Sequence, residues 1–265
     1  MTEFAPISSS GHLILVPWLL NWRFFLSNPD LNKTFDVALH IGTFVGAVLY
    51  FRRDLATYLF ALARSIGRRS VSTIDERLAW FLVIGTIPGA LVGAVGEDFI
   101  ESRLGRPWLI AVMLALFGVV LYLVDRWSEE RRRLEQLRLG DAVLMGLAQA
   151  AALQPGVSRS GVTITAGRGV GLDRPAAARF SFLLSIPIIA GAGLFKGLSV
   201  LQHGLPPGTT TPFLWGMVAS AVSGFLAIWG LLSYLRRRDF APFTIYRLAA
   251  ASVVFTLIAT GARTS

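Results

Sequence analysis

The segment Gln154-Pro-Gly-Val-Ser-Arg-Ser-Gly-Val-Thr-Ile164 is a polar turn within an otherwise apolar part of the chain. It holds one cation, Arg159, within a few residues of hydroxyl groups and glycines. These are Gly156, Ser158, Ser160, Gly161 and Thr163. A guanidinium, hydroxyl donors and exposed backbone N–H groups can converge on the oxygens of one anion. The segment therefore predicts a phosphate-binding turn.

The composition places this turn in a membrane. Hydrophobic residues make up 54% of the chain and charged residues only 15%, a balance that is typical of membrane proteins. In a soluble protein the net charge of +9 would suggest nucleic acid. Here the basic residues cluster in loops, as membrane proteins place them on the cytoplasmic side, so we expect no nucleic-acid partner. The chain has no Cys, which excludes disulfides and thiolate chemistry.

Apolar runs predict the membrane-spanning helices. Six runs are long enough to span, and they must be helical because lone strands cannot satisfy their backbone in lipid. They are 35–51, 78–96, 107–124, 180–195 (extending to 201), 212–235 and 241–260. The runs 13–20 and 142–153 are too short to cross about 30 Å of hydrocarbon. The predicted fold is an all-α integral membrane protein, a polytopic helical bundle, with Arg247 near a span end and reaching toward the membrane surface.

Arginine-rich loops orient these spans. Basic residues cluster at 52–77, 126–138 and 236–238, which predicts that these loops are cytoplasmic. The number of spans then requires the segment 141–175 to enter the membrane and return on the cytoplasmic side. By the same count, the serine-rich segment near the N-terminus dips in from the external face. We therefore expect two re-entrant helical segments.

The two halves of the chain resemble each other. Ile7-Ser-Ser-Ser-Gly11 aligns with Val157-Ser-Arg-Ser-Gly161, and Gly, Pro and Trp residues in the spans align at constant offsets. Each half contains one re-entrant element and three spans, and three is odd, so the halves should have opposite orientations. Inverted repeats place their sites near the midplane, where broken helices meet. The two serine-rich tips are therefore expected to approach each other.

The predicted domain organisation follows from this repeat. We expect one membrane domain of two inverted repeats, 1–125 and 141–262, joined by a cytoplasmic loop, 126–140. The second tip follows an apolar helix at 141–153, whereas only a few residues precede Pro6 in the first half. The repeat thus predicts a further apolar helix upstream, lost through truncation or a misassigned start codon.

The second tip carries the clearest candidate residues. A membrane-embedded arginine such as Arg159 is costly without a partner or a function, and its guanidinium can hold phosphate as a bidentate fork. The alternative is a buried ion pair, for which Glu3 is a candidate partner. Hydroxyl groups beside it are predicted phosphate donors, or else helix caps and interhelical hydrogen bonds. They belong to Ser158, Ser160 and Thr163, while Gly156 and Gly161 allow the tight turn.

The first tip offers different chemistry. His12 can act as a nucleophile or a proton carrier, and the alternative is a local hydrogen bond. Ser8 and Ser9 are candidate nucleophiles or phosphate ligands, with helix capping as the alternative. Glu3 can hold a divalent cation or act as a base, and otherwise is a solvated carboxylate. His40, near the start of a span, is expected at the membrane interface and outside the site.

Two long motifs carry a family resemblance. Thr2-Glu-Phe-Ala-Pro-Ile-Ser-Ser-Ser-Gly-His12 and Pro155-Gly-Val-Ser-Arg-Ser-Gly-Val-Thr163 resemble the two signatures of the undecaprenyl-diphosphatase (bacitracin resistance) family. The resemblance covers nearly the whole chain, including Pro242-Phe-Thr-Ile-Tyr-Arg247. It implies a bacterial membrane phosphatase that hydrolyses undecaprenyl diphosphate to the monophosphate and inorganic phosphate. That reaction recycles the lipid carrier for peptidoglycan and confers bacitracin resistance.

The resemblance also assigns roles to residues. Glu3 matches the second glutamate of a paired motif whose first member would lie four residues upstream, and Ser9, His12 and Arg159 match the family's serine, histidine and arginine. It implies a divalent cation, Mg²⁺ or Ca²⁺, held by Glu3. It places the protein in the bacterial inner (plasma) membrane, in contact with lipid, with the active site toward the periplasmic side. A homodimer is compatible with this picture.

Several alternatives stay open on the sequence. Ser9 or His12 attacks the terminal phosphorus, or His12 activates the attacking group. A rival function is transport, because inverted repeats with re-entrant tips are typical of alternating-access carriers, and a phosphate-binding turn suits a carrier of lipid phosphates as well. A scaffold protein is a third reading, but it does not explain a buried arginine in a serine–glycine turn. Release of inorganic phosphate distinguishes the enzyme from a carrier.

Overall fold

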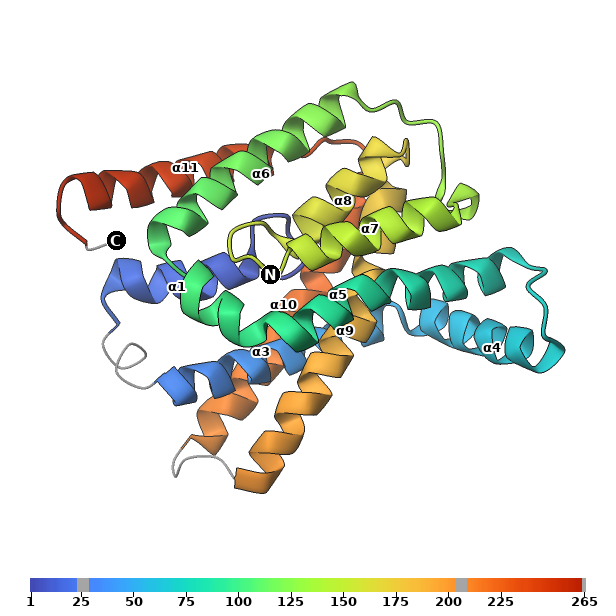
Figure 1. Cartoon of the computed structure of the whole chain (residues 1–265), viewed down its shortest axis with the longest axis horizontal. Coiled ribbons are helices and arrows are strands. Elements are labelled where there is room, and N and C mark those ends of the chain that lie inside the picture. Colours follow the sequence, from blue (N-terminus) through green and yellow to red (C-terminus); the bar gives the residue numbers. More distant parts are fainter. Residues whose placement is uncertain (23–28, 204–208, 264–265) are drawn as a thin grey trace.

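The computed structural model describes residues 1–22, 29–203 and 209–263, and within these ranges it contains helices and no strand of a sheet. The all-α prediction is confirmed. The α-helices are α1 (Ser9–Leu20), α3 (Pro29–Tyr50), α4 (Arg52–Arg68), α5 (Ile74–Leu104), α6 (Pro107–Trp127), α7 (Leu139–Ala151), α8 (Arg159–Gly169), α9 (Arg174–His203), α10 (Thr210–Tyr234) and α11 (Ala241–Ala259). Figure 1 shows how they pack, with the N-terminus near the centre of the bundle.

Among the described residues, five helices are long and apolar enough to cross a membrane. Their spanning stretches are Ile74–Gly96, Pro107–Trp127, Arg174–Leu194, Thr210–Tyr234 and Ala241–Ala259. They match five of the six predicted spans. α1 and α7 are the two short apolar helices, as the sequence predicts.

The sixth predicted span is more complex. It corresponds to α3, which is followed after an 80° bend by a second helix, α4. The sequence predicted only an arginine-rich loop at 52–77, so α4 is a correction. Its charged residues lie near the two ends around a mainly apolar middle, with Asp54 in the first turn and Arg68 in the last turn. Charges so placed favour the helix dipole, and an arginine-rich stretch can therefore be helical.

Small residues bring the helices close together. In α3, a Cβ added at Gly42 or Gly46 would lie 2.4 or 2.3 Å from the carbonyl oxygen of Met217 or Ala221 in α10. A Cβ at Gly146 in α7 would lie 2.4 Å from the Gly85 oxygen in α5. Such close approach of backbones is how membrane helices gain packing contacts. α6 and α11 also lie side by side (Figure 1).

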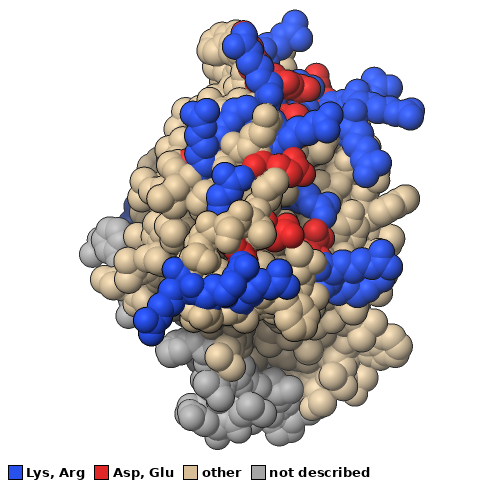
Figure 2. Space-filling view, turned by 90° about the vertical axis from the view of Figure 1, so that its right-hand side faces the viewer, with Lys and Arg blue, Asp and Glu red and all other residues tan. Residues whose placement is uncertain are grey.

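Charged side chains gather at one end of the molecule (Figure 2). Ion pairs connect the elements there. Arg68 pairs with Glu76, Arg179 with Asp54 at 2.6 Å, and Arg168 with Asp125 at 2.7 Å. These pairs join α4 to α5 and α9, and α8 to α6.

Candidate active site

Two serine-rich tips have the same local structure. We call residues 3–10 the first tip and residues 154–160 the second tip. Ser8 and Ser158 both have φ of 74°, and their hydroxyls accept from the backbone N–H groups of Gly11 and Gly161. A positive φ is rare for serine, so both tips share an unusual capping geometry at the start of α1 and α8. The segments that the sequence aligned are therefore similar in conformation.

The tips are in direct contact. The Gly156 N–H donates to the Ser8 hydroxyl at 3.1 Å, and the Ser160 hydroxyl donates to the Ala5 carbonyl at 3.2 Å. The guanidinium of Arg159 donates from Nη2 to Glu3 Oε1, forming an ion pair. Side chains and backbone of segments far apart in sequence thus form one polar cluster inside the bundle.

The second tip needs glycine at its turn. Gly156 has φ of 95°, and a Cβ there would lie 2.6 Å from the Ile110 carbonyl oxygen of α6. This tip therefore packs directly against the α6 backbone. Because α1 and α8 both begin at the tips, their positive helix N-termini face the same cluster, which favours an anion.

Glu3 is the centre of the cluster's charges. Its Oε2 lies 3.5 Å from Nε2 of His40, and its side chain is only 10% exposed. Burial raises the pKa of Glu3, but the charges of Arg159 and His40 and a hydrogen bond from Ser9 lower it more strongly. The pKa of Glu3 therefore lies below its ordinary value, and the carboxylate stays ionised beside Arg159.

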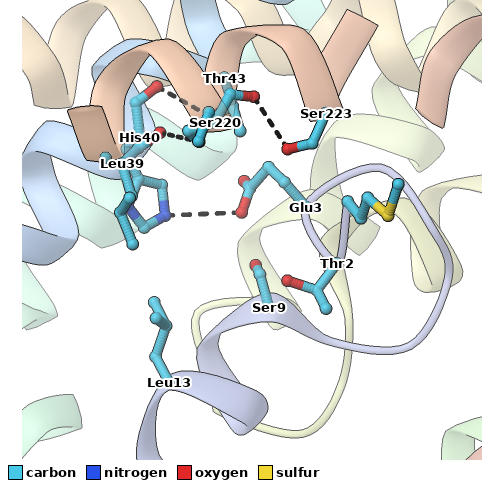
Figure 3. A pocket seen from close by; sticks show the side chains of 12 residues that line it. Thr2, Glu3, Ser9, Leu13, Leu39, His40, Thr43, Ser220 and Ser223 are labelled. Atoms are coloured by element: carbon cyan, nitrogen blue, oxygen red, sulfur yellow. Dashed lines mark hydrogen bonds and ion pairs between the residues drawn. The ribbon is translucent and has the colours of Figure 1, made fainter. Parts of the chain in front are cut away.

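A cavity of about 380 Å³ opens in front of Glu3. The first tip, α1, α3 and α10 form its wall, with Ser9, Leu13, His40, Thr43 and Ser220 among the lining residues. In Figure 3 the side chains of Glu3, Ser9 and His40 point into the same space. The cavity brings a carboxylate, a hydroxyl and an imidazole within reach of one ligand.

His40 was expected at the membrane interface, and the structure corrects this. Its Nδ1 donates to the Asp36 carbonyl oxygen at 2.7 Å, because a carbonyl only accepts. Its Nε2 faces Glu3, with which the protonated ring forms an ion pair. His40 and Thr43 lie three residues apart on one face of α3 and both line the cavity, and this spacing is the sequence signal for the cavity wall.

His12 points elsewhere. Its Nδ1 lies 2.7 Å from the Ser8 carbonyl oxygen and its Nε2 lies 2.6 Å from the Tyr246 hydroxyl of α11. The two rings are stacked with centroids 5.6 Å apart, and His12 is not among the residues that line the cavity. The imidazole has the local hydrogen bonds that the sequence offered as the alternative to a catalytic role.

The hydroxyls of the second tip are also engaged. Thr163 is fully buried, and its hydroxyl lies 2.7 Å from the Arg159 carbonyl oxygen and 2.6 Å from the Ser181 hydroxyl of α9. Ser158 caps α8, and Ser160 is buried against the first tip. In this state the three hydroxyls cap a helix or join elements, and Arg159 is the side chain of this tip that reaches Glu3.

Arg247 was predicted to reach the membrane surface, and this prediction is wrong. Its side chain is fully buried, and its guanidinium donates to backbone carbonyls of both tips and of α6. The sequence shows its place near the start of a span, but not that the tips fold back against that span end.

The described residues hold no group of three or more His, Asp or Glu side chains suited to a metal ion. Glu3 nevertheless faces the cavity with one carboxylate. Mg²⁺ is commonly held by one or two carboxylates, waters and the phosphates of its substrate. The site therefore fits a cation shared with a bound phosphate, with Glu3 as its protein ligand.

Residues 1–253 match the family described as bacitracin resistance protein BacA. The chain belongs to this family. It is 47% identical over 262 residues to a protein of Pelobacter propionicus named undecaprenyl-diphosphatase, covering 98% of this chain and 94% of the relative. A protein of the same name from Desulforudis audaxviator is 49% identical over 258 residues, covering 97% and 93%. One from Geobacter sulfurreducens is 47% identical over 259 residues, covering 97% and 94%.

Proposed function

We propose that this chain is an undecaprenyl-diphosphate phosphatase. It hydrolyses undecaprenyl diphosphate to undecaprenyl phosphate and inorganic phosphate, which recycles the lipid carrier for envelope synthesis and confers resistance to bacitracin. The observation that carries the proposal is the junction of the two tips inside a membrane helix bundle, where Arg159 pairs with Glu3, and Glu3 and Ser9 line one cavity. Near-full-length relatives named undecaprenyl-diphosphatase support it.

Binding of the diphosphate follows from the charges at the tips. Arg159 offers a planar guanidinium to the phosphate oxygens, and the N-termini of α1 and α8 offer backbone N–H groups. The ion pair holds that guanidinium against Glu3, a residue of the cavity wall, before the substrate arrives. The same donors are placed to stabilise the charge that develops on the phosphoryl oxygens in the transition state.

Ser9 is the better placed nucleophile of the two candidates. Its side chain lines the cavity together with Glu3 (Figure 3), and a carboxylate beside a hydroxyl can orient an attacking oxygen. Attack of Ser9 Oγ on the terminal phosphorus would release undecaprenyl phosphate, and water would then release inorganic phosphate from the serine. His12 forms a hydrogen bond with Tyr246 and so holds the first tip in place.

A divalent cation belongs to this proposal. Glu3 is the residue that would hold it, together with the oxygens of the substrate, and the bound cation would neutralise phosphate charge. His40 lies beside Glu3 and limits the space on that side of the carboxylate.

The membrane arrangement completes the proposal. The chain is a multi-pass membrane protein, with five helices of spanning length and composition in the part that the structure describes. We place it in the bacterial inner membrane as two inverted repeats, 1–125 and 141–262, with the cavity reached from the periplasmic side. The support is the clustering of arginines at one end of the bundle (Figure 2) and the matching geometry of the two tips.

The test is release of inorganic phosphate from undecaprenyl diphosphate by the purified protein in detergent, with and without a chelator. The proposal expects phosphate release that depends on a divalent cation, and no release from undecaprenyl monophosphate. A protein that moves the lipid across vesicles but releases no phosphate in detergent is a carrier, and that result would overturn the proposal.

A further inference from the structure

Arg247 of α11 joins four parts of the molecule. Its Nη1 donates to the Pro6 carbonyl of the first tip at 3.2 Å, and its Nη2 donates to the Gly156 and Val157 carbonyls of the second tip at 2.9 and 3.1 Å. It also donates to α6, from Nε to Leu114 at 2.9 Å and from Nη2 to Met113 at 3.2 Å. The guanidinium is therefore a point at which both tips, α6 and α11 are tied together.

The side chain has no room to move. A Cβ added at Gly118 in α6 would lie 3.3 Å from Arg247 Nε, and one at Gly161 in α8 would lie 3.0 Å from its Nη1. Two glycines thus let neighbouring backbones close around the arginine. A fully buried guanidinium held in this way fixes the separation of the carbonyls that it contacts.

The charge of Arg247 meets no counter-ion in the described part of the chain. Among the described residues no carboxylate forms an ion pair with it, and its partners are neutral carbonyls. Arg168 is buried to the same degree but pairs with Asp125. An unpaired buried cation is costly. The tips it holds lie at the N-termini of α1 and α8, where an anion would lower that cost.

We propose that Arg247 is a positioning residue of the site. It fixes the two tips relative to each other, and so places Arg159 against Glu3 and Ser9, while the bound diphosphate anion balances its charge. Since each of its three guanidinium nitrogens donates to a carbonyl, it acts through the tips and does not touch the substrate. This inference rests on the proposed phosphatase activity.

The main test compares two substitutions by their effects on kcat and KM. Arg247→Lys keeps the charge, but one ammonium group cannot span carbonyls on three segments. A misplacement of about 1 Å lowers kcat by about 100-fold, and we expect that loss with KM near the wild-type value. Arg247→Met also removes the charge and should raise KM several-fold in addition. A kcat of Arg247→Lys within about threefold of the wild-type value would overturn the proposal, because threefold is far less than the expected loss of about 100-fold.

Arg168→Lys is the matched control, because Arg168 is also fully buried but lies away from the tips. Both lysine variants should lower the melting temperature, but only Arg247→Lys should lower kcat per folded molecule. An equal loss of kcat in both variants would show a general loss of stability and overturn the positioning role.

A milder variant keeps the test decisive if Arg247→Lys does not fold. Gly118→Ala leaves the arginine in place and pushes its guanidinium by a few tenths of an ångström. It should lower kcat about tenfold, between wild type and Arg247→Lys, at unchanged KM. An unchanged kcat in folded Gly118→Ala would contradict the inference. If the wild-type protein releases no phosphate, the proposed function itself fails. If the wild type is active and only the variants depart from expectation, the positioning role fails.

Discussion

Arg159 and Glu3 lie 156 residues apart in the chain and form an ion pair at the junction of the two tips. Both side chains are largely buried, at 17% and 10% exposure. The sequence offered this pair as the alternative to a phosphate-binding arginine. The geometry allows both roles, because Glu3 lines the cavity and holds the guanidinium next to it.

Two substitutions of Arg159 test whether phosphate release needs the planar guanidinium or only a positive charge. Arg159→Lys keeps a cation but loses the planar fork, and Arg159→Ala leaves Glu3 buried without its partner. We expect phosphate release to fall by about 100-fold or more in both, the range for removing one donor that stabilises a developing oxyanion. Initial rates at saturating substrate measure this. Arg159→Ala turning over near the wild-type rate would contradict a central role for Arg159.

Ser9 and His12 should differ sharply. Ser9→Ala removes the hydroxyl at the cavity and should lower kcat by about 1,000-fold or more, as loss of a nucleophile does. His12→Gln preserves hydrogen-bonding capacity toward Ser8 and Tyr246 and should retain a tenth or more of the rate, roughly the effect of a support residue. A phosphorylated Ser9 trapped by rapid quench would identify the nucleophile independently of the rates. If His12→Gln is as inactive as Ser9→Ala, His12 has a direct chemical role.

The lowered pKa of Glu3 predicts a pH dependence of stability. Because its folded pKa lies below the unfolded value near 4.5, the stabilisation by ionised Glu3 is fully present above about pH 4.5 and is lost as the pH falls through the folded pKa. The difference in melting temperature between wild type and Glu3→Gln should therefore be constant from neutral pH to about pH 5 and shrink below it. A difference that already shrinks between pH 7 and 6 would show that the carboxylate titrates near neutrality.

Thr163 should matter for stability more than for turnover. Its hydroxyl bonds to Ser181 of the neighbouring helix, and such interhelical bonds contribute about 0.6–1.7 kcal/mol. Thr163→Val should lower the free energy of unfolding by about that amount and leave kcat nearly unchanged. Denaturant titration and phosphate release on the same preparation test both parts. A large loss of kcat with little loss of stability would make Thr163 a phosphate ligand.

Gly156 should not tolerate a side chain. With φ of 95° and the Ile110 oxygen 2.6 Å from an added Cβ, Gly156→Ala must displace the second tip from α6. Gly191→Ala in α9 is the control, because a Cβ there meets nothing within 4 Å. We expect Gly156→Ala to lose both folded yield and activity, while Gly191→Ala resembles wild type. Full activity in Gly156→Ala would show that the tip is not packed as described.

The spans and the contact of the tips were predictable from sequence. Apolar runs of sufficient length identify spanning helices because the membrane thickness sets their length. The aligned motifs around Ser8 and Ser158 indicated that two distant segments share one conformation, and the structure gives them the same φ. The Arg159–Glu3 pair followed from the cost of an unpaired buried charge.

Other features depended on tertiary packing. α4 was missed because its arginines suggested a loop, whereas its charges lie at helix ends and on one face. The prediction that His40 lies outside the site considered this residue alone. The polar residues on the same helix face, considered together, indicate the cavity wall. The burial of Arg247 depends on both tips folding against α6 and α11, which no local pattern in the sequence reveals.

The claim that two distant tips form one active site is tested most directly by a double-mutant cycle. Phosphate release from undecaprenyl diphosphate is measured for wild type, Glu3→Gln, Arg159→Lys and the double variant. Groups that act as a unit have strongly non-additive effects, so we predict that the double variant is about as slow as the slower single variant. Reduction factors that multiply in the double variant would show that the tips act independently and would contradict the account.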